Sequence, residues 1–221
     1  VNTFGIKGVK ENAFFLKELS DARKLRSKII ECFERASNPN TPIFMRERLL
    51  HFVIVGAGPT GVESAAEISD FITQDLKRIF PEHIHLDVKI TILEAGSNIL
   101  SMFDTGLQKY TQRFFYRKKI QIYMGAKVTE VKSDSVVLAD GSEIPCGLVL
   151  WSAGIQPRHV IFHKNISSQA EAKLQAEGTA HLVTNDQQTQ HDLPLDARTH
   201  RILVDDHLLV KGTTNVFAIG D

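Results

Sequence analysis

The stretch that most constrains the fold is HFVIVGAGPTGVESAAE, from His51 to Glu67. Its apolar run, Phe52 to Val55, leads directly into Gly56, Gly58 and Gly61, and a helical pattern follows. A dinucleotide site requires this order of strand, glycine turn and helix start. Gly56 permits the turn, Gly58 lets the backbone approach a pyrophosphate, and Gly61 lets helix and strand pack closely. We therefore expect phosphates to bind where the free amides and the dipole of the helix start attract anions.

Helical and strand patterns alternate after this turn. The patterns predict a helix from Gly61 to about Phe80, a loop over Pro81 to Asp87, a strand over Val88 to Leu93, a helix over Thr105 to Lys118 with Asp104 as N-cap, and a strand over Ile120 to Met124. This βαβαβ order predicts an α/β fold with a Rossmann-like, doubly wound parallel sheet.

The flanking regions add to this sheet. Before the turn, we predict an extended segment over Val1 to Val9, one helix over Asn12 to Ser37, and a lead into the strand over Arg46 to Leu50. After it, we predict a small antiparallel meander over Lys127 to Ile144, with strands at Val128 to Val131 and Ser135 to Leu138, and a buried strand at Leu148 to Trp151. The small residues Ser152, Ala153 and Gly154 follow this last strand, at the sheet edge where such folds bind ligands.

The last third of the chain has a different composition. The polar stretch from 163 to 192 is interpreted as an insertion with a short helix over Ser168 to Ala176. Short strands are expected at Arg201 to Val204 and Leu208 to Val210, and Asn215 to Asp221 reads as a strand entering a glycine turn. Both ends of the chain look like cuts through a second domain.

Composition excludes several classes of function. The 221 residues carry no net formal charge, so no broad field favours nucleic acid or an anionic membrane. Cys32 and Cys146 form no CxxC pair and read as reduced, buried thiols. No apolar run approaches the ~20 residues that span a bilayer. The pairs His83 with His85 and His159 with His163 lack further ligands nearby, so we expect no metal site.

Three acids are candidates for site chemistry, each with a structural alternative. Glu94 closes the strand after the glycine turn, where a carboxylate binds ribose hydroxyls and repels a 2′-phosphate, which favours NADH over NADPH. The alternative for Glu94 is a solvated strand end. Glu63 is placed in the first helical turn, either near the phosphates or the nicotinamide, or as an acid stabilised by the helix dipole. Asp221 either binds hydroxyls of a second nucleotide or is an ordinary turn aspartate.

Taken together, these residues resemble the type II (alternative, rotenone-insensitive) NADH dehydrogenases, above all the mitochondrial forms. The motifs that carry the resemblance cover most of the chain in the family's order: NTFGIKGV from Asn2, FLKELSDARKLRSKI from Phe15, HFVIVGAGPTGVESAAEI from His51, VKITILEAGSNILSMFD from Val88, LVLWSAGIQPR from Leu148 and VFAIGD from Val216.

The resemblance implies a flavoprotein with two dinucleotide-binding domains that oxidises NADH at FAD and reduces a membrane quinone without pumping protons. It assigns NADH contacts to Gly56, Gly58, Pro59, Thr60, Gly61, Glu94, Ala153 and Gly154, FAD contacts to Gly220 and Asp221, and a place beside the reacting rings to Glu63. Glu63 is therefore the candidate catalytic residue. The implied partners are NADH, a quinone, a membrane surface bound through a C-terminal segment outside this chain, and a second copy in a homodimer. The implied location is the mitochondrial inner membrane, as a peripheral protein.

The resemblance also implies the domain order. Residues 1–48 would be a partial FAD-domain segment with a connecting helix, 49–154 the NAD(H) domain, and 155–221 the return to the FAD domain. The family's FAD glycine motif, quinone segment and C-terminal amphipathic helix do not occur in the chain, so it reads as a central portion. One alternative is therefore an NADH-binding module, or an inactive fragment without stable FAD binding. Another is a disulfide-type reductase, which the lack of a CxxC pair disfavours.

Overall fold

The computed structural model describes residues 2–154, 194–196 and 201–220. The chain divides into two compact units, Val1–Ile155 and Gln156–Asp221. The predicted insertion at 163–192, with its short helix, and Asp221 lie outside the described residues.

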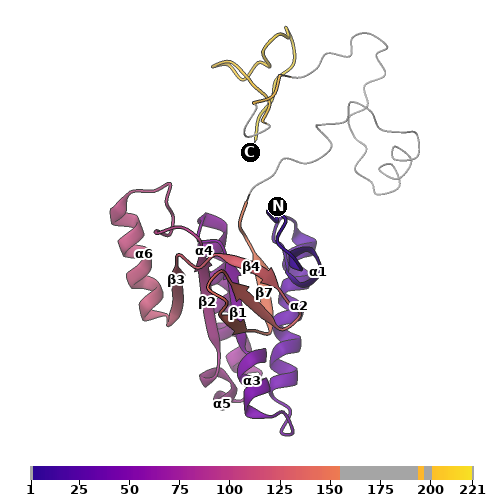
Figure 1. The fold of residues 1–221 in the computed structure, drawn as a ribbon, viewed down its shortest axis with the longest axis vertical. Helices are drawn as coiled ribbons and strands as arrows, with labels where there is room; N and C mark the ends of the chain where they lie inside the picture. The colour runs from indigo at the N-terminus through magenta and orange to yellow at the C-terminus, as the bar shows by residue number, and fades with distance from the viewer. Residues whose placement is uncertain (1, 155–193, 197–200, 221) are drawn as a thin grey trace, which may run out of the picture. The chain divides into compact units, whose positions relative to one another are not determined.

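The first unit is built on a four-stranded parallel sheet (Figure 1). Its strands are β1 (His51–Val55), β2 (Lys89–Glu94), β3 (Ile120–Met124) and β7 (Leu148–Trp151). The order β3-β2-β1-β7 places β1 between the strand that follows it in the chain and the strand that comes last. The direction of winding reverses beside β1, and ligands bind in such sheets at this point.

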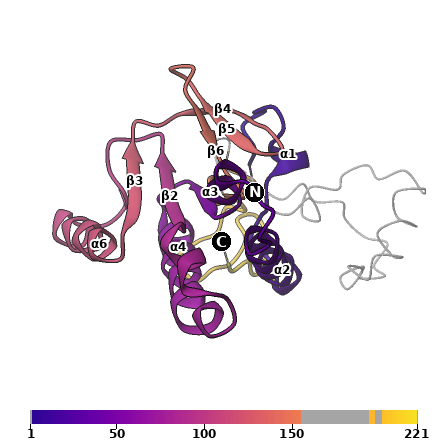
Figure 2. The same ribbon diagram turned by 90° about the horizontal axis from the view of Figure 1, so that it is seen from below.

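Helices and a second sheet surround these strands. The helices are α1 (Val9–Asn12), α2 (Leu19–Ala36), α3 (Ile43–Leu49), α4 (Pro59–Asp70), α5 (Glu82–Leu86) and α6 (Thr105–Arg117). The second sheet is an antiparallel meander of β4 (Val128–Val131), β5 (Ser135–Leu138) and β6 (Glu143–Pro145). Figure 2 shows the meander on one side of the parallel sheet and α2 and α4 on the other. The α/β class and the small meander are confirmed.

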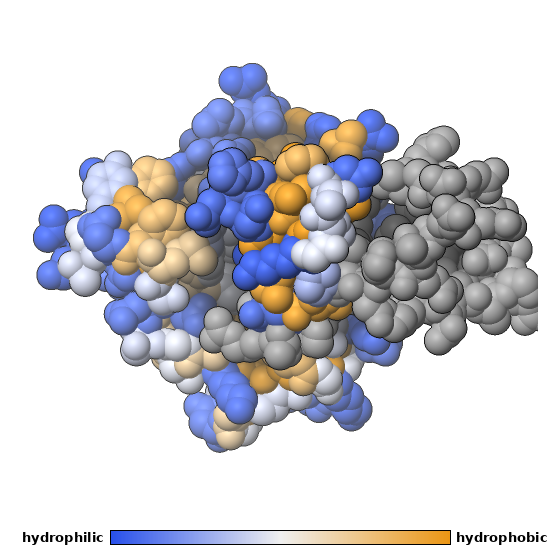
Figure 3. Space-filling view, turned by 90° about the horizontal axis from the view of Figure 1, so that it is seen from above, coloured by the Kyte–Doolittle hydropathy of each residue, from blue (hydrophilic) through white to orange (hydrophobic). Residues whose placement is uncertain are grey.

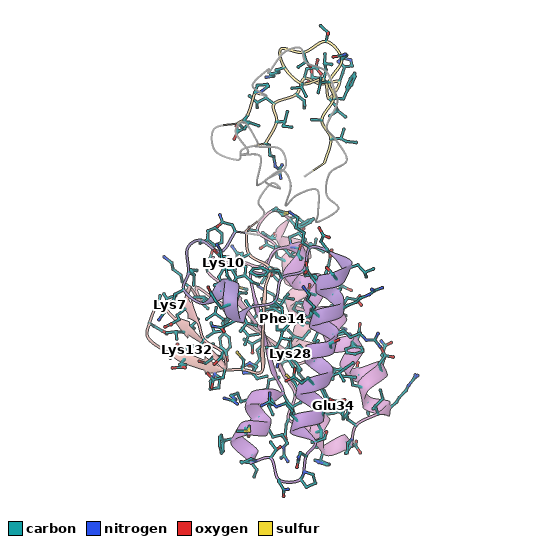
Figure 4. All side chains as sticks on the ribbon, turned by 90° about the vertical axis from the view of Figure 1, so that its right-hand side faces the viewer. Lys7, Lys10, Phe14, Lys28, Glu34 and Lys132 are labelled. Carbon is teal, nitrogen blue, oxygen red and sulfur yellow. The ribbon has the colours of Figure 1, made fainter. Side chains whose placement is uncertain are left out.

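Alternate residues of the parallel strands face two separate cores, as the period of a strand requires. Residues facing the helices include Phe52, Ile54, Ile90, Ile92, Leu148 and Leu150. Residues facing the meander and α1 include Val53, Val55, Leu93, Val149 and Trp151. On this second side, Lys7 and Lys132 lie near one another (Figure 4) and pair with Glu130 and Glu143, at 2.7 and 2.9 Å.

The prediction of one helix over Asn12–Ser37 is wrong. The backbone is extended around Phe14, whose amide donates to Val149 O (2.8 Å) and whose carbonyl accepts from Trp151 N (2.7 Å). This bridge to β7 interrupts the helical pattern, so α1 ends at Asn12 and α2 begins only at Leu19. Pairing with the sheet therefore overrides the local helical periodicity.

The long helix predicted to reach Phe80 also differs. The α-helix ends at Asp70 and continues as a π-helical turn, Phe71–Asp75, and a 3₁₀ turn, Leu76–Arg78. Thr73 contributes to the change, since its hydroxyl donates to the Ser69 carbonyl (2.9 Å) and competes with the backbone. Sequence reasoning also missed the short helices α3 and α5, which it treated as a lead-in and a loop.

The second unit contains isolated antiparallel bridges in place of the three predicted strands. These join Leu195 to Ile202, Val204 to Val210 and Leu209 to Phe217. Within the described parts of both units, no helix is long and apolar enough to cross a membrane.

Candidate dinucleotide site

The glycine turn after β1 has the conformation that its sequence predicts. Gly56 has φ +102°, in the region that favours glycine. A Cβ on Gly61 would overlap the Gly56 carbonyl oxygen and would lie 2.7 Å from Ser152 Oγ. The structural roles predicted for Gly56 and Gly61 are therefore confirmed.

Gly58 differs from these two glycines. It is the N-cap of α4, with φ −72° and ψ −178°, which any residue can adopt. A Cβ added here would meet no atom within 4 Å. Folding therefore does not require glycine at this position, and the open space in front of it is available to a ligand.

The start of α4 lacks a side-chain cap, in contrast to the starts of α2 and α6. The Asp104 side chain accepts from Gly106 N and Leu107 N at the start of α6, and Glu18 and Asp21 form a capping box on α2. In the described part of the chain, no side chain caps α4, and Pro59 occupies its first position. The first amides of α4 therefore point to a region where an anion can satisfy them.

Glu94 ends β2 beside this turn, and its carboxylate joins two loops. Oε2 accepts from Ala57 N at 2.7 Å, and Oε1 accepts from Gly96 N at 2.7 Å. The Glu94 carbonyl also accepts from Ala126 N at 2.8 Å. The half-buried carboxylate is thus held at the end of the strand, and each oxygen has a second lone pair for a ligand hydroxyl.

A cavity of about 770 Å³ opens at these strand ends. Gly56, Glu94, Trp151 and Ala153 line it from the parallel strands, and residues 4–7 and 126–129 complete the wall. The Trp151 indole N–H donates to Asn2 O at 3.0 Å, which fixes the wall to the N-terminal segment. The site is therefore enclosed partly by residues that precede β1 by more than forty positions.

The loop between β2 and α6 packs on the glycine turn. Leu100 N donates to Ala57 O at 2.8 Å, while Met102 and Phe103 further along the loop are 74% and 43% exposed. Seen from above, the molecule exposes hydrophobic residues among hydrophilic ones (Figure 3). Met102 and Phe103 therefore add apolar surface to the loop that packs on the glycine turn.

Three further predicted site residues, Glu63, Gly154 and Gly220, lie outside the glycine turn itself. Glu63 is exposed in the second turn of α4, so the prediction that it lies in the first helical turn is wrong. Gly154 has φ +71°, and its carbonyl accepts from Asn2 N at 3.0 Å. Gly220, with φ +115°, belongs to the other unit. The predicted residues that meet at the carboxyl ends of β1, β2 and β7 are Gly56, Gly58, Pro59, Thr60, Gly61, Glu94 and Ala153.

Sequence reasoning missed the part that Ser152 plays. Its hydroxyl lies 2.8 Å from Val55 O and 3.0 Å from Gly56 O, and so links the end of β7 to the turn. The available signal was a serine directly after a buried strand, in a run of small residues. No group of three potential metal ligands occurs among the described residues.

Known proteins resemble this chain over most or all of its length. A family model described as "Pyridine nucleotide-disulphide oxidoreductase" matches residues 1–193. A "Probable NADH dehydrogenase" of Dictyostelium discoideum is 46% identical over 220 residues, which cover all of this chain and 43% of the relative. An Arabidopsis thaliana protein, "External alternative NAD(P)H-ubiquinone oxidoreductase B2, mitochondrial", is 38% identical over 226 residues, covering all of this chain and 34% of the relative.

A solved structure also resembles this chain. That of NDH2 from Plasmodium falciparum in complex with NADH matches with a TM-score of 0.68 and 31% identity, over 73% of this chain and 34% of the other. The chain thus spans less than half the length of these relatives.

Proposed function

The chain belongs to the pyridine nucleotide-disulphide oxidoreductase family, and on that premise we propose that it is the NADH-binding portion of an NADH:quinone oxidoreductase. The observation that carries the proposal is the open space over Gly58, beside the uncapped start of α4 and the carboxylate of Glu94. A pyrophosphate fits the first place and a ribose the second. The relatives' names supply the reaction class, since they are NADH dehydrogenases and NAD(P)H-ubiquinone oxidoreductases.

The residues then take the following roles. Gly56, Gly58, Pro59, Thr60 and Gly61 hold the pyrophosphate, and Glu94 holds the adenosine ribose and disfavours a 2′-phosphate. Ala153 and Gly154 line the nicotinamide side. These assignments agree with the cavity, which Gly56, Glu94 and Ala153 share.

When bound, NADH and FAD supply the redox chemistry, a hydride leaving the nicotinamide for the flavin. The chain contributes binding and orientation, because a hydride moves only between rings held face to face. Glu63 is proposed to tune charge near the reacting rings, and Gly220 and Asp221 to contact FAD. In the complete protein, 49–154 would be the NAD(H) domain, with 1–48 and 155–221 contributing to the FAD domain.

The same proposal extends to the surroundings of the protein. Its electrons would pass to a quinone at the mitochondrial inner membrane, as expected from relatives that carry "mitochondrial" in their names. The membrane would be bound through a segment outside this chain, and a homodimer is the assembly to test.

The single tryptophan provides a direct test. Trp151 is 1% exposed and lines the cavity, so NADH bound there should quench its emission by energy transfer. We expect saturable quenching by NADH and none in the Gly58→Val variant. Unchanged quenching in that variant would place the NADH site elsewhere.

A second measurement separates the two functional alternatives. The chain is incubated with FAD and gel-filtered, and a water-soluble quinone is added with NADH. A yellow protein that reduces the quinone supports the oxidoreductase, whereas a colourless chain that still binds NADH supports a binding module.

A further inference from the structure

The two edges of the parallel sheet differ in what pairs with their backbone groups. At one edge, the extended segment around Phe14 bonds to β7. At the other edge, β3 pairs with β2 and with no other described strand. A groove of about 850 Å³ runs along this second edge, lined by all five residues of β3 and by the end of α6. Figure 2 shows α6 and β3 together at this edge.

The groove, lined by Arg117 and Lys119, and the adjoining face of α6 are basic, although the whole chain has no net charge. Residues 105–124 contain five cationic side chains and no acid. Lys118 pairs with Asp70. The other four, Lys109, Arg113, Arg117 and Lys119, are exposed and make no ion pair with any residue in the described ranges.

Aromatic side chains lie between these charges. Tyr110, Tyr116 and Tyr123 are 60%, 85% and 48% exposed. A second hollow, of about 640 Å³, is lined by Tyr110, Arg113, Tyr116 and Arg117 on α6. Arginine and tyrosine together are typical of surfaces that bind other chains.

The charge decides what can occupy the edge. A second copy paired through the same strand would bring a second basic α6 beside the first, and the like charges of the two helices would oppose this pairing. A flat lipid surface would leave the free backbone groups of the strand without partners. An extended peptide can bond to those groups, and acidic side chains on it would meet the cations.

We propose that the β3 edge, with the basic face of α6, binds an acidic peptide segment of a partner protein as an added strand. Five residues of β3 span roughly 17 Å, enough for a short strand of matching length. The segment's acidic side chains would lie toward Arg113, Arg117 and Lys119. This surface is independent of the glycine turn and of the proposed NADH site.

The test uses the full chain and a fluorescent eight-residue peptide of alternating glutamate and valine. We expect saturable binding by fluorescence anisotropy that weakens as salt is added. The Arg113→Glu/Arg117→Glu variant should bind at least about tenfold more weakly, or about 1.4 kcal/mol. Arg23→Glu/Lys24→Glu, an equal change of charge at exposed residues of α2, should bind like the wild type.

Two further probes separate strand addition from simple charge attraction. The same glutamate and valine peptide with every backbone amide N-methylated has the same charge but no backbone donors, so it should not bind. Hydrogen exchange at residues 120–124 should slow with the valine peptide. Equal binding of both peptides, or no change in exchange, would overturn strand addition.

Vesicles of phosphatidylcholine with phosphatidylserine test the lipid alternative. Binding to these vesicles that the Arg113→Glu/Arg117→Glu variant loses, without binding of the valine peptide, would replace the proposal with a membrane surface. Circular dichroism of each variant checks the fold.

Discussion

The amino and carboxyl ends of the parallel sheet differ in the groups that make their contacts. At the amino end, side chains bond to one another and to carbonyls. His51 Nδ1 lies 2.8 Å from Pro145 O and Nε2 lies 2.8 Å from Thr91 Oγ1, while Arg48 pairs with Asp134 at 2.5 Å. These polar groups at the amino end are therefore satisfied by contacts within the chain.

At the carboxyl end, the contacts are made mainly by the backbone, and one face stays open. Gly56, Gly58 and the first amides of α4 surround an open space, and the cavity adjoins them. Glu94, Lys7 and Lys127 are the charged residues that line this cavity. One end therefore supports stability and the other leaves groups for a ligand, so substitutions at the two ends should have separable effects.

The largest expected effect is on stability, from Gly147→Ala at the amino end. An added Cβ would overlap the Leu49 carbonyl oxygen and lie 2.8 Å from Leu49 Cα, both in backbone that cannot move freely. We expect unfolding free energy to fall by about 3 kcal/mol or more, measured by urea denaturation. Gly58→Ala, at the open end, is the matched control and should unfold like the wild type. Equal losses in both variants would remove the contrast between the ends.

Next in size is the effect of Gly58→Val on NADH affinity. The side chain enters the space assigned to the pyrophosphate, so NADH binding should weaken more than about 100-fold, roughly 2.7 kcal/mol. Calorimetric titration measures this, and the melting temperature should change little, because no atom beyond the neighbouring residues and the helix backbone lies within 4 Å of an added Cβ. A loss of stability in this variant would show instead that protein atoms pack around Gly58.

A smaller effect on stability is expected when the pH is lowered, and it acts through His51 at the amino end of the sheet. Burial lowers the pKa of His51 below its ordinary value of 6.5, although the hydrogen bond to Pro145 opposes this shift. The unfolded chain therefore binds a proton that the folded chain does not, and stability falls as pH drops below about 6.5. Unfolding free energies measured between pH 8 and pH 5.5 should show this slope, and His51→Gln should flatten it. The carboxylates with lowered pKa, such as Glu31, titrate in a more acidic range.

The smallest effect is on cofactor choice. Glu94→Gln removes the charge that repels a 2′-phosphate while it keeps the size of the side chain. The ratio of NADH to NADPH affinity should fall about fivefold, or roughly 1 kcal/mol, as measured by competition binding. Glu67→Gln, an exposed residue of α4, is the control. An unchanged ratio would make Glu94 a loop-joining residue alone.

Much of the central fold could be predicted from local pattern. The strands Ile120–Met124 and Leu148–Trp151 and the Asp104 cap have the predicted bounds, because apolar runs and a capping aspartate carry strong local signals. The break at Phe14 could not be predicted, since its partner β7 lies more than 130 positions away. The same limit applies to the site. The glycines are visible in sequence, but the contact of Ala57 N with Glu94, across 37 positions, appears only in the folded chain.

The two amides that bind the Glu94 carboxylate determine when this side chain loses its rotamer freedom. A free glutamate loses rotamer freedom when a ligand arrives, at about 0.5–1.5 kcal/mol for each immobilised side chain. Here Ala57 and Gly96 immobilise it during folding, so that entropy is already lost before a dinucleotide arrives. A ribose would meet a pre-organised acceptor, and the association rate would not wait for a side-chain rearrangement.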